Sequence, residues 1–211
     1  MTNRLPWTLL AAAATVLVWS GIRPHDYFTW LLEVLPALLG AAVLLATYRR
    51  FRFTELAYVL MTLHAVILMV GGHYTYAEVP LFDWIRDTFH QARNNYDKVG
   101  HFAQGFIPAI VAREILLRTS PLRPSKWLSF LVVAVCLAFS AVYEFIEWWV
   151  ALASGTAADS FLGAQGYVWD TQSDMLYCAV GAVLSLALFT RLHDRMLQAR
   201  PRRTPQGTGI R

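Results

Sequence analysis

Residues 127–151 read WLSFLVVAVCLAFSAVYEFIEWWVA, and Glu144 and Glu147 are the only charged residues in this stretch. An α-helix crosses the hydrocarbon core of a bilayer with about 20 predominantly apolar residues. The stretch therefore predicts a membrane-spanning helix with two carboxylates near one end. Composition extends this prediction to the whole chain, because 56% of the 211 residues are hydrophobic, 15% are charged and the mean hydropathy is +0.41.

Five further segments are similarly apolar, so the expected fold class is all-α, a polytopic bundle of six transmembrane helices. Residues 80–95 carry apolar and charged side chains at helical spacing, which predicts an interfacial helix between the third and fourth spans. We expect one transmembrane domain over residues 1–197 and a disordered basic tail over residues 198–211. The expected spans are residues 5–22, 27–48, 54–72, 98–117, 127–151 and 170–191.

The basic residues are distributed unevenly about these spans. With the N-terminus in the cytoplasm, 14 of the 18 lysines and arginines lie on the cytoplasmic side. This asymmetry follows the positive-inside rule and predicts a bacterial cytoplasmic (inner) membrane protein with both termini inside. The pI near 9.3 then reflects topology and contact with anionic lipid, so we expect no nucleic-acid partner. The basic residues expected outside are Arg23, Arg86, Arg93 and Lys98.

Acidic and histidine residues gather at the outer ends of the expected helices. Three helices each contribute a pair whose members are three or four residues apart and therefore share one helix face. Glu33 and His73 belong to the same level of the second and third spans. Ionisable groups at membrane depth are costly to keep, so the cluster is a candidate functional site. The pairs are Asp97 with His101, Glu144 with Glu147, and Asp170 with Asp174.

Converging carboxylate and imidazole groups are suitable ligands for a divalent metal ion. Charge balance favours such a cation, because Lys98 is the only fixed positive charge expected at the level of six carboxylates. We expect a site for zinc, manganese or magnesium, with Glu144 or Glu147 as the general base. The expected metal ligands are His73, Asp97, His101, Asp170 and Asp174.

Each of these residues also has a structural explanation. Asp97 and Asp170 are placed to cap the N-termini of their helices, and Thr171 with Asp174 has the form of a capping box. His73 follows two glycines and suits an ordinary interfacial position. The pattern of residues alone leaves both interpretations open.

Four motifs resemble one known family. They are GGHYTY at residues 71–76, NNYDKVGHFAQGF at 94–106, YEFIEWW at 143–149 and WDTQSDM at 169–175. In this order, and over nearly the whole chain, they resemble the bacterial YjdF-like inner-membrane proteins, a family of unknown function. More distantly the chain resembles VanZ-like proteins, although Glu147 and Cys178 stand where those proteins usually have glutamine and asparagine. The resemblance implies six membrane helices and no particular reaction.

Three functional hypotheses follow. The first is metal-assisted hydrolysis or transfer on a membrane lipid or lipid-linked small molecule, because such a substrate readily reaches a site at this depth. The second is a proton- or cation-coupled carrier, although the sequence contains no inverted repeat. The third is a non-catalytic protein with a structural polar network. The sequence lacks a nucleophile elbow, a Walker loop and an HExxH motif, which disfavours serine hydrolases, nucleotide-driven pumps and zincins.

Overall fold

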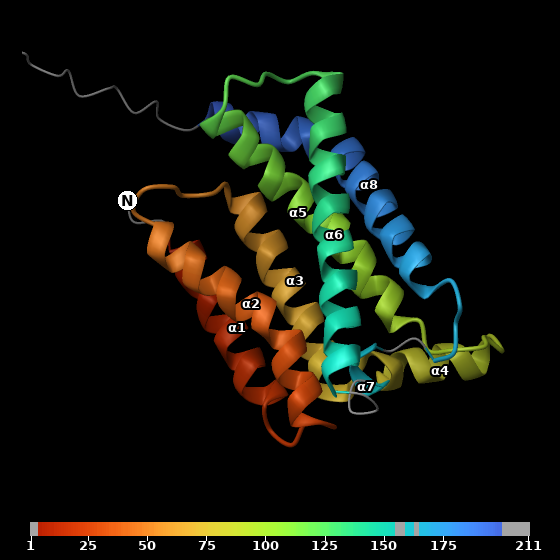
Figure 1. Ribbon diagram of the computed structural model, residues 1–211. Helices are drawn as coiled ribbons and strands as arrows, with labels where there is room; N and C mark the ends of the chain where they lie inside the picture. Colours follow the sequence, from red (N-terminus) through yellow and green to blue (C-terminus); the bar gives the residue numbers. More distant parts are fainter. Residues whose placement is uncertain (1–3, 155–158, 163–164, 200–211) are drawn as a thin grey trace, which may run out of the picture.

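The computed structural model describes residues 4–199, apart from residues 155–158 and 163–164. Within these ranges all regular secondary structure is helical, which confirms the all-α prediction (Figure 1). The elements in chain order are α1 (Leu5–Ser20), α2 (Tyr27–Thr47), α3 (Glu55–Tyr74), the short 3₁₀ helix η1 (Tyr76–Glu78), α4 (Pro80–Thr88), α5 (Tyr96–Thr119), α6 (Lys126–Ser154), α7 (Asp159–Leu162) and α8 (Asp170–Gln198).

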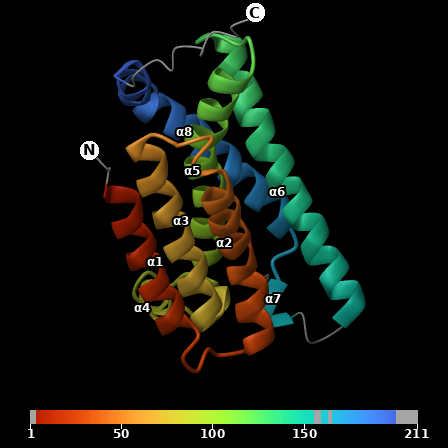
Figure 2. The ribbon, with the colours of Figure 1, turned by 90° about the vertical axis from the view of Figure 1, so that its left-hand side faces the viewer.

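Helix α5 occupies the centre of the bundle. It packs against α3 on one side and against α6 and α8 on the other, and its most extensive contact is with α8. Helices α1 and α2 both pack on α3, so they form one flank of the molecule while α6 and α8 form the other (Figures 1 and 2). This central position explains why α5 buries charged residues at both of its ends.

The N-termini of the helices differ in how they are capped. Asp26 caps α2 by accepting a hydrogen bond from the backbone N–H of Thr29 at 2.6 Å, and this bond holds the pKa of Asp26 below its usual value. At α8 the N-cap residue is Trp169, which makes no side-chain capping bond. The predicted capping box of Thr171 and Asp174 is therefore wrong. The Asp174 side chain is buried against α5 instead, where it meets a lysine.

Glycines bring α5 and α8 close together. A β-carbon added at Gly105 would clash with the backbone of Cys178, and one added at Gly181 would clash with the backbone carbonyl of Phe102. Small residues at a contact allow two membrane helices to approach backbone to backbone. The close approach sets the N-terminal turns of the two helices side by side, which positions the candidate site.

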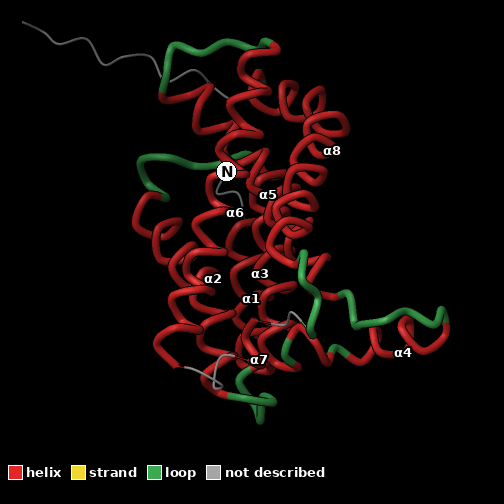
Figure 3. Tube along the Cα trace, turned by 45° about the vertical axis from the view of Figure 1, so that its right-hand side comes forward, coloured by secondary structure: helices red, strands yellow, loops and turns green. Residues whose placement is uncertain are grey.

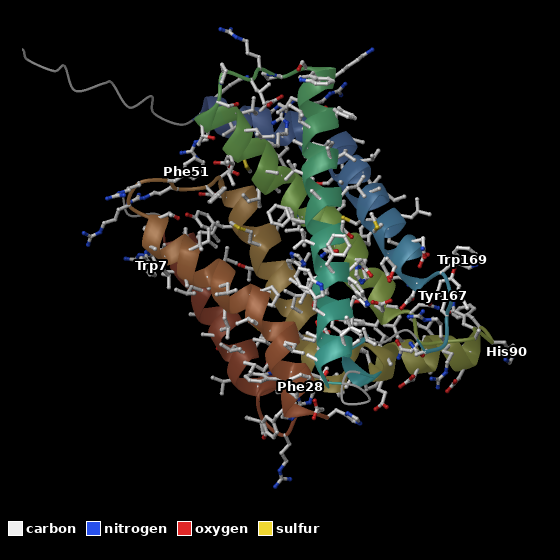
Figure 4. All side chains as sticks on the ribbon, viewed as in Figure 1. Trp7, Phe28, Phe51, His90, Tyr167 and Trp169 are labelled. Atoms are coloured by element: carbon white, nitrogen blue, oxygen red, sulfur yellow. The ribbon has the colours of Figure 1, made fainter. Side chains whose placement is uncertain are left out.

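Four of the described helices are long and apolar enough to cross a membrane, namely α2, α3, α6 and α8. Helix α1 is apolar but has 16 residues, and α5 has 24 residues with charged residues in its first and last turns. Trp7 and Phe28 project from opposite ends of the α1 and α2 flank (Figure 4), as expected of an aromatic belt at two membrane surfaces. The prediction of six spans is thus supported for four helices and stays a prediction for the other two.

Two further expectations concern the connections and the C-terminus. The predicted interfacial segment contains α4, which extends sideways from one end of the bundle (Figure 3). The predicted end of the last span at residue 191 stays a prediction, and α8 continues beyond it to Gln198 and fully buries His193 against α5. The expected tail at 198–211 lies almost entirely outside the described residues.

Candidate functional site

Two aspartates and a histidine meet where α5 and α8 begin. His101 Nε2 lies 3.2 Å from Asp97 Oδ1 and 3.9 Å from Asp174 Oδ2. One ligand atom from each of the three side chains lies within 4.8 Å of the other two. All three residues are buried. We refer to Asp97, His101 and Asp174 as the Asp–His–Asp cluster.

Lys98 and Arg93 neutralise much of the acidic charge. The Lys98 ammonium lies 2.6 Å from Asp174 Oδ1, 2.7 Å from Asp170 Oδ1 and 3.1 Å from Asp97 Oδ2. The Arg93 guanidinium lies 2.6 Å from Asp170 Oδ1 and 3.1 Å from Asp97 Oδ2. The prediction that Lys98 is the only fixed positive charge at this level is wrong. Arg93 precedes α5 in the chain, and its long side chain extends forward over the first turn of α5 to Asp97 and Asp170.

The two carboxylates of the cluster use their oxygens in a consistent way. Asp97 and Asp174 each turn one oxygen toward Lys98 and the other toward Nε2 of His101. Lys98 therefore orients both carboxylates, as outer-shell partners of a metal site do. Asp170 is linked to the cluster through Arg93 and Lys98, which both donate hydrogen bonds to its Oδ1.

Both ring nitrogens of His101 face oxygen atoms. Nδ1 lies 3.2 Å from Gln104 Oε1, and Nε2 lies 3.2 Å from Asp97 Oδ1. In a neutral ring only one nitrogen carries a proton, so the other directs its lone pair at an oxygen. That arrangement is repulsive unless a positive charge lies between the groups. A second proton on the ring or a bound cation would supply this charge.

A cavity of about 80 Å³ adjoins the cluster. Asp97 and His101 line it from α5, and Glu33 and Glu147 line it from α2 and α6. The Tyr143 hydroxyl donates to Glu33 Oε2 at 3.4 Å. A space of this size admits a few water molecules or a small polar group. Asp97 is paired with Lys98 and Arg93, but among the described residues that line the cavity there is no lysine or arginine, so Glu33 and Glu147 face the space without a fixed counter-charge.

Aromatic rings enclose the site. Tyr167, labelled in Figure 4, lies with its ring 5.5 Å from Lys98 Nζ and 5.7 Å from the Arg93 guanidinium carbon. On the inner side, the Tyr76 ring fits where neither Gly71 nor Gly100 could carry a β-carbon without clashing with it. The GGHYTY motif therefore supplies one wall of the cavity.

Two predicted site residues are not members of the Asp–His–Asp cluster: Glu144 lies beside it, and His73 lies away from it. Glu144 is buried with its Oε1 4.0 Å from His101 Nδ1, and that oxygen has no hydrogen-bond partner in the described part of the chain. His73 faces α1, where its Nδ1 lies 3.0 Å from the carbonyl oxygen of Ser20 and its ring packs on Trp19. His73 lies in the last turn of α3 against α1, and within the described residues it forms no ion pair or hydrogen bond with the acids described above.

A second buried cluster, which was not predicted from the sequence, lies at the other end of α5. Glu114 is fully buried and accepts hydrogen bonds from the Thr54 hydroxyl at 2.7 Å and from Arg118 at 2.6 Å. Arg113 donates to His193 Nδ1 at 2.9 Å, so His193 donates from Nε2 to Glu114 at 3.2 Å. These bonds join α3, α5 and α8. The signal available in the sequence was the carboxylate of Glu114 inside the expected span 98–117.

Comparison with known proteins defines the family. The family model described as "Predicted membrane protein (DUF2238)" matches residues 5–195. The chain belongs to this family. It is also 50% identical to inner membrane protein YjdF of Escherichia coli (strain K12) over 202 residues, which cover 94% of this chain and 97% of that protein. No solved structure matches the chain.

Membership of the DUF2238 family confirms the YjdF-like resemblance and the membrane character of the chain. The more distant VanZ-like resemblance receives no support from these matches and stays an expectation. Both buried clusters lie within residues 5–195, so they belong to the part of the chain that defines the family.

Proposed function

We propose that this DUF2238 protein is a six-span protein of the bacterial inner membrane with both termini in the cytoplasm. We propose further that it binds zinc, manganese or magnesium at the Asp–His–Asp cluster and catalyses hydrolysis or transfer on a lipid or lipid-linked substrate. The name of its Escherichia coli relative supports the inner-membrane location. The excess of basic residues expected inside supports the orientation.

The observation that carries the proposal is the convergence of two carboxylates and one imidazole on one point. Asp97 Oδ1, Asp174 Oδ2 and His101 Nε2 face one another while Lys98 holds the opposite carboxylate oxygens. An oxygen-rich site with one imidazole suits zinc or manganese, and magnesium also accepts carboxylate ligands. The Gln104 bond on the far side of the ring provides the partner that orients a metal-binding histidine.

The general base of the proposed reaction is Glu147. It lines the same cavity as Asp97 and His101, so a water molecule in that cavity would be enclosed by walls that carry both the base and cation ligands. Asp97, His101 and Asp174 would hold the cation, which would polarise a carbonyl or phosphoryl oxygen of the substrate. Glu147 takes one proton from the water, whose oxygen bonds to the polarised centre. The ester bond then breaks, and the proton passes to the departing alcohol oxygen.

The ion pairs favour a second candidate, a polar network that stabilises the bundle without catalysis. Arg93 and Lys98 already pair with Asp170, and both contact Asp97. If His101 carries a second proton, the three aspartates balance three positive charges. In that case the cluster needs no metal ion.

Metal content separates the two candidates. The detergent-purified protein is incubated with zinc, manganese or magnesium, passed over a desalting column and subjected to elemental analysis. We expect one bound ion per chain in the unaltered protein, loss of that ion in Asp174→Asn, and retention in the matched variant His73→Gln. A chain that keeps none of the three metals, with its helical circular dichroism intact, would support the stabilising network.

The role of Glu147 is tested separately. Glu147→Gln keeps the shape of the side chain and removes its basicity. We expect this variant to retain the metal ion while losing the change in cellular lipid composition that expression of the unaltered protein produces. Lipid mass spectrometry of cells that express either form measures the change. If cells with Glu147→Gln have the same lipid profile as cells with the unaltered protein, and cells without the protein have a different one, then Glu147 takes no part in the reaction.

A further inference from the structure

An apolar groove of about 230 Å³ lies between α1, α2 and α3. It differs from the acidic cavity in polarity, because nearly all of its walls are hydrocarbon. At Gly40 a β-carbon would meet no atom within 4 Å, which shows that the groove is open beside α2. The wall residues that define it best are Trp7, Leu10, Ala13, Gly40, Leu44 and Met61.

The groove and the acidic cavity adjoin each other. Pro36 of α2 and His64 and Leu68 of α3 line both spaces. From this junction the groove extends along α3 to Tyr58, while the cavity continues to Glu33, Glu147 and the Asp–His–Asp cluster. The two spaces together suit an amphiphile, because the groove is long and apolar and the cavity is small and polar.

His64 stands at the point where the polarity changes. It is half-buried, it lines both spaces, and it makes no hydrogen bond to the described part of the chain. A polar group on an apolar wall without a hydrogen-bond partner is destabilising. An oxygen atom of a ligand at the junction would provide the missing partner.

The length of the groove fits one hydrocarbon chain. Leu68 lies ten positions after Tyr58, which is a rise of about 15 Å along an α-helix. The hydrocarbon core of a bilayer is about 30 Å thick, so the groove matches the depth of one leaflet. The cavity at its end is lined by Glu33 and Glu147, which face no lysine or arginine among the described lining residues; this favours hydroxyl donors and disfavours an anionic head.

We infer that the chain binds an acyl ester of a small polyol, with its hydrocarbon chain in the groove and its hydroxyl-bearing head in the acidic cavity. The ester group lies at His64, whose imidazole donates a hydrogen bond to an ester oxygen. Glu33 and Glu147 accept hydrogen bonds from the hydroxyl groups of the head. This inference names the substrate class of the proposed enzyme and rests on that proposal for the reaction, whereas binding itself does not require it.

The test uses a monoacylglycerol that carries a diazirine in its acyl chain. The probe is photolysed with the full-length protein in detergent, and the labelled peptides are mapped by mass spectrometry. We expect labelling of α1, α2 and α3 peptides that contain groove residues, and loss of that labelling in Gly40→Phe. The matched variant Leu39→Phe, at a side chain that is 58% exposed and outside the groove, should label normally. Equal labelling of Gly40→Phe and the unaltered protein would overturn the inference.

Competition identifies the head group. Unlabelled monoacylglycerol should suppress the groove labelling, whereas hexadecane and a lysophospholipid with an anionic head should suppress it much less. Suppression by hexadecane as strong as that by monoacylglycerol would mean that the cavity recognises no head, and would overturn the assignment. Groove labelling that persists in a protein without bound metal would uphold the binding inference while the catalytic proposal fails.

Discussion

Lys98 is the residue on which the charge balance of the site most depends. Its ammonium group contacts Asp97, Asp170 and Asp174, and its side chain is 9% exposed. In Lys98→Met the three carboxylates would face one another with Arg93 as the remaining fixed cation. Removing one partner of a buried ion pair costs about 3–5 kcal/mol. We expect a clear fall in melting temperature in detergent.

The control for this prediction is Lys126→Met, because Lys126 is exposed at the first position of α6. Thermal unfolding of both variants, followed by circular dichroism, makes the comparison. An unchanged melting temperature for Lys98→Met would mean that Lys98 does not hold the aspartates together.

The individual residues show what a sequence can reveal about a buried site. Asp97 and His101 were recognisable because they are four residues apart on one helix. The ion pair of Arg93 with Asp170 was not, because 77 positions separate the two residues; the contact of Arg93 with Asp97 spans only four positions, but Arg93 lies before the helix begins, where helical spacing does not apply. The pair of Glu114 and His193 was missed for the same reason, since 79 positions separate them.

At the level of the helices, the contact between α5 and α8 determines whether the site exists. Gly105 lies against the backbone of Cys178, so the β-carbon of Gly105→Ala would push the two helices apart. We expect a lower melting temperature together with lower metal content, because Asp97 and Asp174 come from the two separated helices. Gly40→Ala is the matched control, since the added carbon meets nothing there. Full metal content in Gly105→Ala would show that the cluster does not depend on this contact.

The helices were predictable to different degrees. α2, α3, α6 and α8 follow from apolar runs of sufficient length. The last turns of α8 did not, because the charged residues beyond position 191 are typical of a cytoplasmic tail. In the structure the same turns continue the helix and bury His193 against Glu114 and Arg113 of α5. Tertiary packing, which local hydropathy does not record, accounts for the difference.

For the molecule as a whole, the orientation in the membrane decides which side the acidic cavity faces. The positive-inside rule predicts that both chain termini are cytoplasmic, because 14 of the 18 basic residues then lie inside. A reporter enzyme that is active only in the periplasm should therefore be silent when fused after Arg203. The same reporter inserted in the segment between α3 and α5, after Gln91, should be active. The reverse pattern would place the acidic cavity on the cytoplasmic side.

The central claim is that the Asp–His–Asp cluster holds a divalent cation through the imidazole of His101. Electron paramagnetic resonance of manganese(II) bound to the purified protein tests this claim most directly, because a coordinated imidazole adds a ¹⁴N coupling to the spectrum. The account predicts one such nitrogen in the unaltered protein and in His73→Gln, and none in His101→Gln. A bound manganese spectrum without the nitrogen coupling, or a coupling that survives His101→Gln, would contradict it.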